Sequence, residues 1–307
     1  DLTPLTTADG KVFVVLKDKY ELYCLDLNDG SVLWRVPFGG LLDGPPTIVG
    51  NRAYIGCGDG YVYCLDIAGG RLAWRLLAAR FQRLSLDDDA LSSTWPVHSA
   101  VLYQNGQIIV EAGRSSYLDG GIHLYALEPA TGKVIAHEKM EGPYPTMEQM
   151  KQPVIFKGGR KGSKGADQYV TGYDMEGASP DILVGDGKNI YMRQSMFDEN
   201  LENIPTQRSS GYGVRPLGER HLMANTGFLE DSFFHRTFWM YEDIWPGKSG
   251  GSGTAAHAGT LVVLGEEGSY AAQHYTGGWY PKHRNGEGNT LLHDTYETRS
   301  RPIYDVE

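Results

Sequence analysis

Residues 50–75 read GNRAYIGCGDGYVYCLDIAGGRLAWR, and residues 10–35 read GKVFVVLKDKYELYCLDLNDGSVLWR. The second stretch is a copy of the first, because an offset of forty residues superposes their turns and strand ends. The superposed pairs are Gly10 and Gly50, Tyr23 and Tyr63, Gly30 and Gly70, and Trp34 and Trp74. The chain therefore contains an internal repeat.

Each copy holds short apolar runs separated by Gly and Asp turns, which is the pattern of antiparallel hairpin strands. A period near forty residues is typical of β-propeller blades, and one blade must stack on a neighbour to bury both faces of its sheet. We therefore expect an all-β chain, a propeller of four-stranded blades. About six to eight blades are expected in a single domain over residues 1–307, and we expect some of them to be hidden in the long loops or missing from this chain.

A third copy carries the nine-residue signature YALEPATGK at Tyr125–Lys133. With the strand ends before Trp34 and Trp74, it resembles the repeat of quinoprotein-like (PQQ-like) propellers. The resemblance covers roughly the first 140 residues, and the segment from Trp95 to Pro145 is most similar to secreted bacterial members. Similar repeats occur in quinone-dependent alcohol dehydrogenases and in the scaffold lipoprotein of the outer-membrane barrel-assembly machinery. The resemblance implies a fold and a periplasmic or extracellular location.

Composition excludes several functions. The net charge of −10 argues against nucleic acid as a partner, since phosphate binding needs a basic stripe. No apolar run approaches the roughly 18 residues of a membrane span. Cys24, Cys57 and Cys64 do not have the spacing of a zinc or haem motif, so we expect small buried side chains and no metal site. Because the chain begins at Asp1 without an initiator Met, we expect a mature product or a fragment.

Three regions depart from the repeat. Long inserted loops are expected near residues 78–95, with an Asp-rich run, and near residues 142–177, with a Gly- and Lys-rich run. The tail 277–307 shows no strand period, so we expect it to be irregular. Between these regions, further blade hairpins are expected near the following segments: 181–194, 215–227, 233–241 and 260–273.

The third copy also carries an insertion. Where the second copy turns within residues 58–60 (GDG), the third uses the nine residues 113–121 (GRSSYLDGG) between conventional strands. A projection held on a rigid hairpin is the usual architecture of a binding loop. The structural alternative is that Arg114 and Asp119 bond within the loop and join neighbouring blades.

Polar and aromatic residues gather where the repeat breaks down, and the loops of successive blades surround one mouth of a propeller channel. Each is weak evidence alone, because a histidine such as His98 or a tryptophan such as Trp239 is more often a core residue. The candidate catalytic residues are His98, Arg114, Tyr117 and His235. The candidate ligand-binding residues are Trp95, Asp119, Arg193, Arg236 and Trp239.

Two function classes follow. The first is a binding or scaffold module for a carbohydrate or protein partner. The rival is a polysaccharide lyase, in which an arginine neutralises a uronate carboxylate and a tyrosine or histidine moves the proton alpha to it. A quinone-dependent dehydrogenase ranks third, because the chain lacks the adjacent cysteines of those enzymes and Trp34 and Trp74 fit blade-packing positions. We therefore expect no cofactor.

Overall fold

The computed structural model describes the side chains of residues 5–86, 91–142, 181–192 and 195–204, and beyond these the backbone of the strands named below. The described residues are almost entirely β-structure, and the one helical turn among them is the 3-10 turn Lys17–Lys19. This confirms the all-β prediction.

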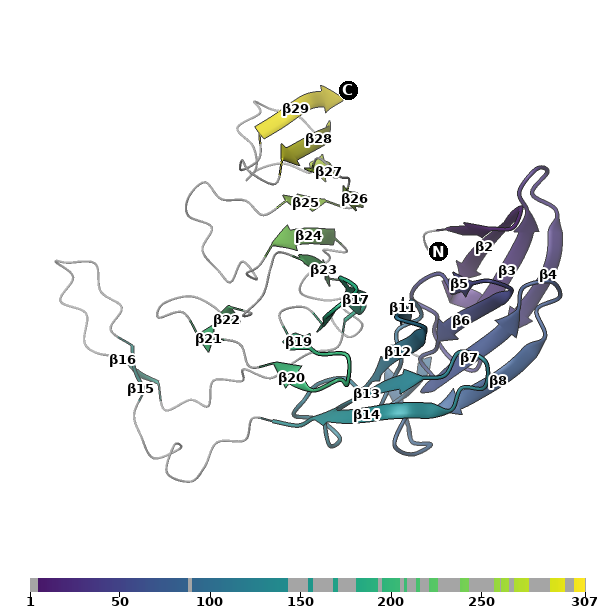
Figure 1. Ribbon diagram of the computed structural model, residues 1–307, viewed down its shortest axis with the longest axis horizontal. Coiled ribbons are helices and arrows are strands. Elements are labelled where there is room, and N and C mark those ends of the chain that lie inside the picture. Colours follow the sequence, from purple (N-terminus) through teal and green to yellow (C-terminus); the bar gives the residue numbers. More distant parts are fainter. Residues whose placement is uncertain are drawn as a thin grey trace.

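Five four-stranded antiparallel sheets follow the chain, each with its strands in sequence order, and we call them blades (Figure 1). The first three blades consist of β1 (Thr6–Ala8), β2 (Lys11–Leu16), β3 (Glu21–Asp26) and β4 (Val32–Pro37); β5 (Thr47–Val49), β6 (Arg52–Gly56), β7 (Tyr61–Asp66) and β8 (Leu72–Leu77); and β11 (Leu102–Gln104), β12 (Gln107–Ala112), β13 (Ile122–Leu127) and β14 (Val134–Met140).

Later blades are shorter or less regular. They consist of β17 (Val184–Gly185), β18 (Ile190–Met192), β19 (Ser195–Phe197) and β20 (Asn203–Ile204); a three-stranded sheet of β23 (His221–Asn225), β24 (Phe238–Glu242) and β25 (His257–Gly259); and β26 (Leu261–Leu264), β27 (Gly268–Tyr275), β28 (Gly288–Thr295) and β29 (Arg301–Val306). The remaining strands form two-stranded sheets, namely β9 (Leu84–Asp87) with β10 (Ala90–Ser93), β15 (Val154–Phe156) with β16 (Gln168–Val170), and β21 (Gln207–Arg208) with β22 (Val214–Arg215).

Strands occur in three regions where the sequence predicted inserted loops or an irregular tail. The tail 277–307 contains β28 and β29, which complete a four-stranded sheet, although their His- and Asp-containing sequences hide the alternation of a half-buried strand. The loop near residues 78–95 carries the β9–β10 hairpin. The loop near 142–177 contains the short pair β15–β16.

Blades one and two superpose with an offset of forty residues only over their third and fourth strands. Cys24 pairs with Trp34 and Cys64 with Trp74, each beside a bulge, which preserves the offset of forty. In the preceding strand, however, Lys11 pairs with Asp26 whereas Arg52 pairs with Asp66, an offset of 52 − 11 = 41. The superposition of Gly10 on Gly50 is therefore wrong by one residue. A one-residue slip reverses the face of every side chain in a strand, so the correction decides which residues are in the core.

The tryptophan of one blade docks on the turn of the next. Trp34 Nε1 donates to the Ile67 carbonyl at 3.0 Å, and Trp74 Nε1 donates to the Pro129 carbonyl at 2.9 Å. A Cβ atom at Gly132 would lie 2.5 Å from the Trp74 ring, so only glycine allows this approach. The predicted equivalence of the two tryptophans is confirmed. Both are half-buried rather than buried, because each ring covers a turn at the edge of the interface.

The core lies between blades. One apolar cluster joins blades one and two around Phe13, Leu22 and Ile55, and a second joins blades two and three around Tyr54, Val62 and Ile108. A third lies between blades three and four. Cys24, Cys57 and Cys64 are free and buried, in line with the prediction of small core side chains. Stacking thus buries both faces of blades two and three.

One end of the sheets carries every candidate residue with a described side chain. Successive strands alternate in direction, so the turn between second and third strands and the passage to the next blade lie at the same end. We call this end the connection face, made by residues 38–46, 57–60, 78–86, 91–101 and 113–121. Among the described residues, no helix is long and apolar enough to cross a membrane.

Candidate functional site

The inserted loop 113–121 lies between β12 and β13, whose bounds match the expected flanking strands. It is tightly folded: the Gly113 amide donates to the Pro96 carbonyl at 3.1 Å, and the Gly121 amide donates to the Leu118 carbonyl at 2.8 Å. A Cβ atom at Gly121, where φ is +96°, would lie 2.1 Å from the Met140 carbonyl oxygen. The insertion is therefore built into blade three.

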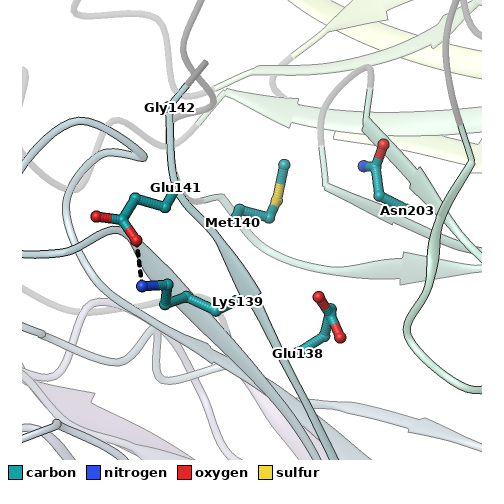
Figure 2. A pocket seen from close by; sticks show the side chains of 6 residues that line it. All are labelled: Glu138, Lys139, Met140, Glu141, Gly142 and Asn203. Carbon is teal, nitrogen blue, oxygen red and sulfur yellow. Dashed lines mark ion pairs between the residues drawn. The ribbon is translucent and has the colours of Figure 1, made fainter. Parts of the chain in front are cut away.

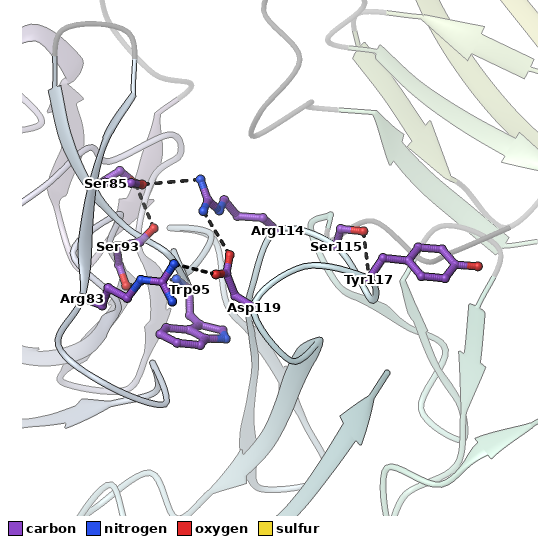
Figure 3. A network of polar contacts seen from close by, with 9 residues as sticks. Arg83, Ser85, Ser93, Trp95, Arg114, Ser115, Tyr117 and Asp119 are labelled. Carbon is purple, nitrogen blue, oxygen red and sulfur yellow. Dashed lines mark hydrogen bonds and ion pairs between the residues drawn. The ribbon is translucent and has the colours of Figure 1, made fainter. Parts of the chain in front are cut away.

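Arg114 is occupied by interactions inside the protein (Figure 3). Its guanidinium pairs with Asp119 at 3.1 Å and donates to the Ser85 hydroxyl at 3.4 Å. The second carboxylate oxygen of Asp119 pairs with Arg83 at 3.1 Å. Arg83 and Ser85 belong to the connector between blades two and three. The loop thus joins that connector to blade three, as the structural alternative for Arg114 and Asp119 describes.

Tyr117 lies on the other side of the loop. Figure 3 shows its ring pointing away from Arg114 and Asp119. The neighbouring Ser116 hydroxyl donates to the Gly142 carbonyl at 2.7 Å, and the Gly142 amide donates back to the Ser116 carbonyl. Although Arg114 and Tyr117 are three residues apart, they do not face a common space. A carboxylate held by Arg114 would not meet the Tyr117 hydroxyl in this arrangement.

Trp95 is a core residue in this structure. Its side chain is buried, its ring meets the Phe81 ring edge-on at 5.9 Å, and its amide donates to the Ser93 hydroxyl at 3.1 Å. A sugar platform needs an open aromatic face. The ring of Trp95 presents no such face to solvent.

His98 is buried against Asp43, a residue that the sequence reasoning missed. His98 Nδ1 and Asp43 Oδ2 are 2.5 Å apart, and the Ser99 amide donates to Asp43 Oδ1 at 2.7 Å. The Asp43 amide donates to the Ser99 hydroxyl at 2.9 Å. The passage into blade two is thereby bound to the passage into blade three.

Burial and neighbouring charges shift the pKa values of the groups in this cluster. Burial alone would lower the pKa of His98, but the carboxylate of Asp43 raises that pKa to about 9. Burial alone would raise the pKa of Asp43, yet the charge and hydrogen bond of His98 bring that pKa below its usual value. Burial raises the pKa of nearby Glu111 to about 8, despite His98. Near neutral pH His98 and Asp43 therefore form an ion pair beside a protonated Glu111.

A positional signal could have found Asp43. It lies four residues before Thr47, the first residue of β5, and His98 lies four residues before Leu102, the first residue of β11. The two partners thus occupy equivalent positions in successive blades. Glu111 left no such signal, because it lies in a strand, β12, whose sequence does not distinguish it from its neighbours.

The remaining candidates are not placed. His235, Arg193 and Arg236 lie outside the described residues, and Trp239 belongs to β24, of which only the backbone is described. Their roles stay predictions. Among residues with described positions, no group of three or more His, Cys, Asp or Glu side chains could hold a metal ion.

A shallow hollow of about 260 Å³ lies at the edge between β14 and β20 (Figure 2). Its lining residues are Glu138, Lys139, Met140, Glu141, Gly142 and Asn203. Lys139 forms an ion pair with Glu141, so the single cation of the lining is already neutralised. The lining includes two carboxylates, no aromatic ring and one large apolar side chain, that of Met140, which is not the lining of a small-molecule site.

The sequence profile of a protein family described as outer membrane protein assembly factor BamB matches residues 2–160. No match was found among the curated proteins. Among solved structures, BamB from Moraxella catarrhalis shares 12% identity, with 86% of this chain and 79% of that chain covered and a TM-score of 0.39.

Two dehydrogenase structures are also similar. The quinohemoprotein alcohol dehydrogenase from Comamonas testosteroni shares 17% identity over 45% of this chain and 20% of that chain, with a TM-score of 0.38. The enzyme ADHIIG from Pseudomonas putida HK5 shares 16% identity over 44% of this chain and 20% of that chain, with a TM-score of 0.37. The matched part spans about a fifth of these dehydrogenases.

Proposed function

Because this chain belongs to the family of the outer membrane protein assembly factor BamB, whose members are PQQ-like repeat β-propellers, we propose that it is a scaffold module that binds a protein partner. The proposal includes a periplasmic or extracellular location. The buried thiols are compatible with an oxidising compartment: burial raises the pKa of Cys24 and of Cys64 to about 11, which keeps them as unreactive thiols.

One observation carries the choice of a protein partner. On the connection face, the charged side chains of Arg114, Asp119 and Arg83 bind one another, while large apolar side chains are exposed beside them. The exposed side chains are Phe81, Leu84, Leu86 and Leu91. Exposed large apolar side chains beside polar groups are typical of a protein interaction site. The ion pairs among Arg83, Arg114 and Asp119 hold the connector that carries these apolar side chains against blade three.

The lyase hypothesis has less support. It requires a cation free to neutralise a uronate and a tyrosine or histidine beside the same sugar. Arg114 is paired with Asp119, Tyr117 points away from it, and His98 is buried with Asp43. A carbohydrate ligand likewise finds no open aromatic ring in Trp95. Binding of a glycan therefore ranks second to binding of a protein.

The test uses the tagged full chain, recovered from its native host after mild crosslinking, together with a panel of uronic-acid polysaccharides. We expect a stoichiometric complex with one host protein and no ultraviolet-absorbing unsaturated product. An unsaturated product from any glycan would replace the scaffold proposal with the lyase. A chain recovered alone under every condition would remove the proposal as well.

A further inference from the structure

Two histidines of blade three lie on the sheet face that packs against blade two. His123 in β13 and His137 in β14 share this face with Tyr125, because Tyr125 pairs with His137 and lies two residues after His123. Tyr125 packs against the apolar cluster that joins blades two and three. The histidine pair therefore lies at the interface between these blades.

Equivalent positions in the first two blades also hold a side-chain pair. In blade one, Arg35 forms an ion pair with Glu21, and in blade two, Arg75 lies over the ring of Tyr61 at 4.9 Å from its centroid. The strand registers make these pairs equivalent to the histidine pair of blade three. Histidine is the side chain whose ordinary pKa falls between pH 5 and 8. Of these three pairs, only the one in blade three is expected to change charge in that range.

One proton is shared between the two imidazole rings. His123 Nδ1 and His137 Nε2 are 2.9 Å apart, and the ring planes differ by 3°. The ring centroids are 5.2 Å apart, so the two nitrogens face each other edge to edge. A neutral imidazole has one donor and one acceptor nitrogen, whereas an imidazolium has two donors. The hydrogen bond therefore survives protonation of one ring and is lost when both rings are protonated.

His123 is the ring of the pair that resists protonation. It is 6% exposed, and its Nε2 atom is buried without a hydrogen-bond partner among the described residues. His137 is exposed, so water can solvate its charge. A charge on His123 would form away from water and without a compensating hydrogen bond at Nε2, which costs free energy. The interface must open before His123 can hold a proton comfortably.

Arg80 brings the connector between blades two and three to the same place. It follows Ala78 and Ala79, which are buried in the cluster between these blades. A Cβ atom at Gly120 would lie 3.2 Å from the Arg80 guanidinium, so Arg80 lies against the inserted loop. Gly120 precedes His123 by three residues. The start of the connector, the end of the inserted loop and His123 therefore meet at one point.

The charges around His123 are mostly positive. Lys139, opposite His123 in β14, forms an ion pair with Glu141 (Figure 2). Burial is the largest cause of the lowered pKa of His123, which falls to about 4. The positive charges of His137, Lys139 and Arg80 lower this pKa further. The carboxylate of Glu141 acts in the opposite direction. A proton on His123 is thus opposed by both burial and charge.

We propose that the His123–His137 pair is an acid-sensitive latch between blades two and three, which releases the start of the connector when both rings carry a proton. Two imidazolium nitrogens cannot stay hydrogen-bonded at the observed separation, and Arg80 repels the charged ring of His123. Protonation of histidines at an interface is a known physical basis for a pH switch. The inference goes beyond the proposed function, because it describes a response of the chain itself and requires no partner.

The pH range of the latch follows from the two states of His123. A solvated histidine in the open state has its ordinary pKa of about 6.5, whereas the pKa in the closed state is about 4. The closed state is therefore fully favoured above about pH 6.5 and loses stability as the pH falls toward 4. Because the open state binds one proton more, the opening constant should rise by up to about tenfold per pH unit in this range.

Hydrogen–deuterium exchange of the full chain, corrected for the intrinsic effect of pH on amide exchange, measures the opening. We expect the protection of residues 76–83 to fall by up to about tenfold per pH unit below about pH 6.5, while residues 21–26 of blade one stay protected. In H123Q, which keeps a neutral hydrogen-bonding side chain, the protection of residues 76–83 should stay constant. Nitrogen-15 NMR signals of the His123 ring should show its protonation over the same range. An equal fall in H123Q, or at residues 21–26, would overturn the latch.

Two further variants carry the test if H123Q does not fold. H137Q removes a positive neighbour of His123, so the fall in protection should move to higher pH. E141Q removes the opposing negative charge, so the fall should move to lower pH. A merely structural role would lower the protection in both variants alike. Shifts in the same direction, or no shift in either variant, would therefore contradict the proposal.

Discussion

Single residues on the connection face act mainly as joints between blades. Asp43 binds His98 across two blade passages, and Asp119 binds Arg83 and Arg114 across a connector and a loop. Breaking a buried pair by removing one partner leaves an uncompensated group, which is more damaging than losing a surface pair. Substitutions of these residues should therefore lower the stability of the folded protein rather than alter a catalytic or binding function.

The buried cluster around His98 makes stability depend on pH. Glu111 in the folded state has a pKa raised to about 8, and His98 a pKa raised to about 9, so both bind a proton more tightly folded than unfolded. Both contributions are complete below their ordinary pKa values and are lost as pH rises through the raised ones. Asp43 and Asp181 are the other carboxyls whose charges reach the cluster. Between about pH 6.5 and 9 the free energy of unfolding should fall.

The E111Q variant separates the two groups. A glutamine cannot ionise, so the fall in unfolding free energy between about pH 6.5 and 8 should be roughly halved. Above pH 8 the variant should also be more stable than the wild type, since no buried carboxylate forms. Urea unfolding at a series of pH values measures both effects. The same slope in both proteins would mean that Glu111 does not titrate in the folded state.

Trp74 offers a second residue-scale prediction. Its ring covers Gly132 of the next blade and its indole donates to the Pro129 carbonyl. W74A should lower the free energy of unfolding by about 3 kcal/mol, the low end for a large aromatic, because the ring is half-buried. W74F should lower it by about 1 kcal/mol, since mainly the hydrogen bond is lost. A loss below about 1 kcal/mol for W74A would show that the tryptophan does not hold the blades together.

At the scale of elements, the inserted loop 113–121 is a structural joint rather than a free binding loop. Arg114 and Asp119 reach the connector on one side, and Ser116 reaches Gly142 on the other. The sequence correctly predicts the length of the loop and the bounds of its flanking strands, because both follow from the alignment of the repeats. It does not say which way each side chain points, since that depends on the connector packed above.

R114A therefore tests the loop. It removes the ion pair to Asp119 and the bond to Ser85, so we expect a melting temperature several degrees lower. Y117F, which keeps the ring, serves as the control within the same loop. Thermal unfolding followed by circular dichroism measures both. If R114A melts like the wild type yet loses ligand or partner binding, Arg114 is a recognition residue and the loop must be reconsidered as a site.

At the scale of the whole molecule, equivalent positions of the repeat have unequal burial. Ile67 in blade two is 4% exposed beneath Trp34, whereas Leu27, its equivalent in blade one, is 55% exposed. Gly30 likewise has no atom within 4 Å of a Cβ position, whereas Gly70 lies against Trp34. Position within the array, not the repeat sequence, decides whether a side chain is covered.

This difference gives a matched pair of variants. I67A should lower the free energy of unfolding by about 2–4 kcal/mol, as for other buried aliphatic deletions. L27A should change it by less than about 0.5 kcal/mol. Chemical denaturation of the full chain measures both. An equally large loss for L27A would show that another blade covers blade one in solution.

The sequence by itself determined the all-β class, the blade period, the tryptophan positions and the bounds of the inserted loop. These features follow from local sequence patterns that each copy repeats, so the pattern of one copy predicts the elements of the next. Only the tertiary structure decided that the register slips by one residue between Lys11 and Arg52, that Asp43 meets His98, and that Arg114 turns inward while Leu86 turns outward. Such contacts join residues from different blades, and their geometry depends on how the sheets stack rather than on any residue's neighbours in the chain.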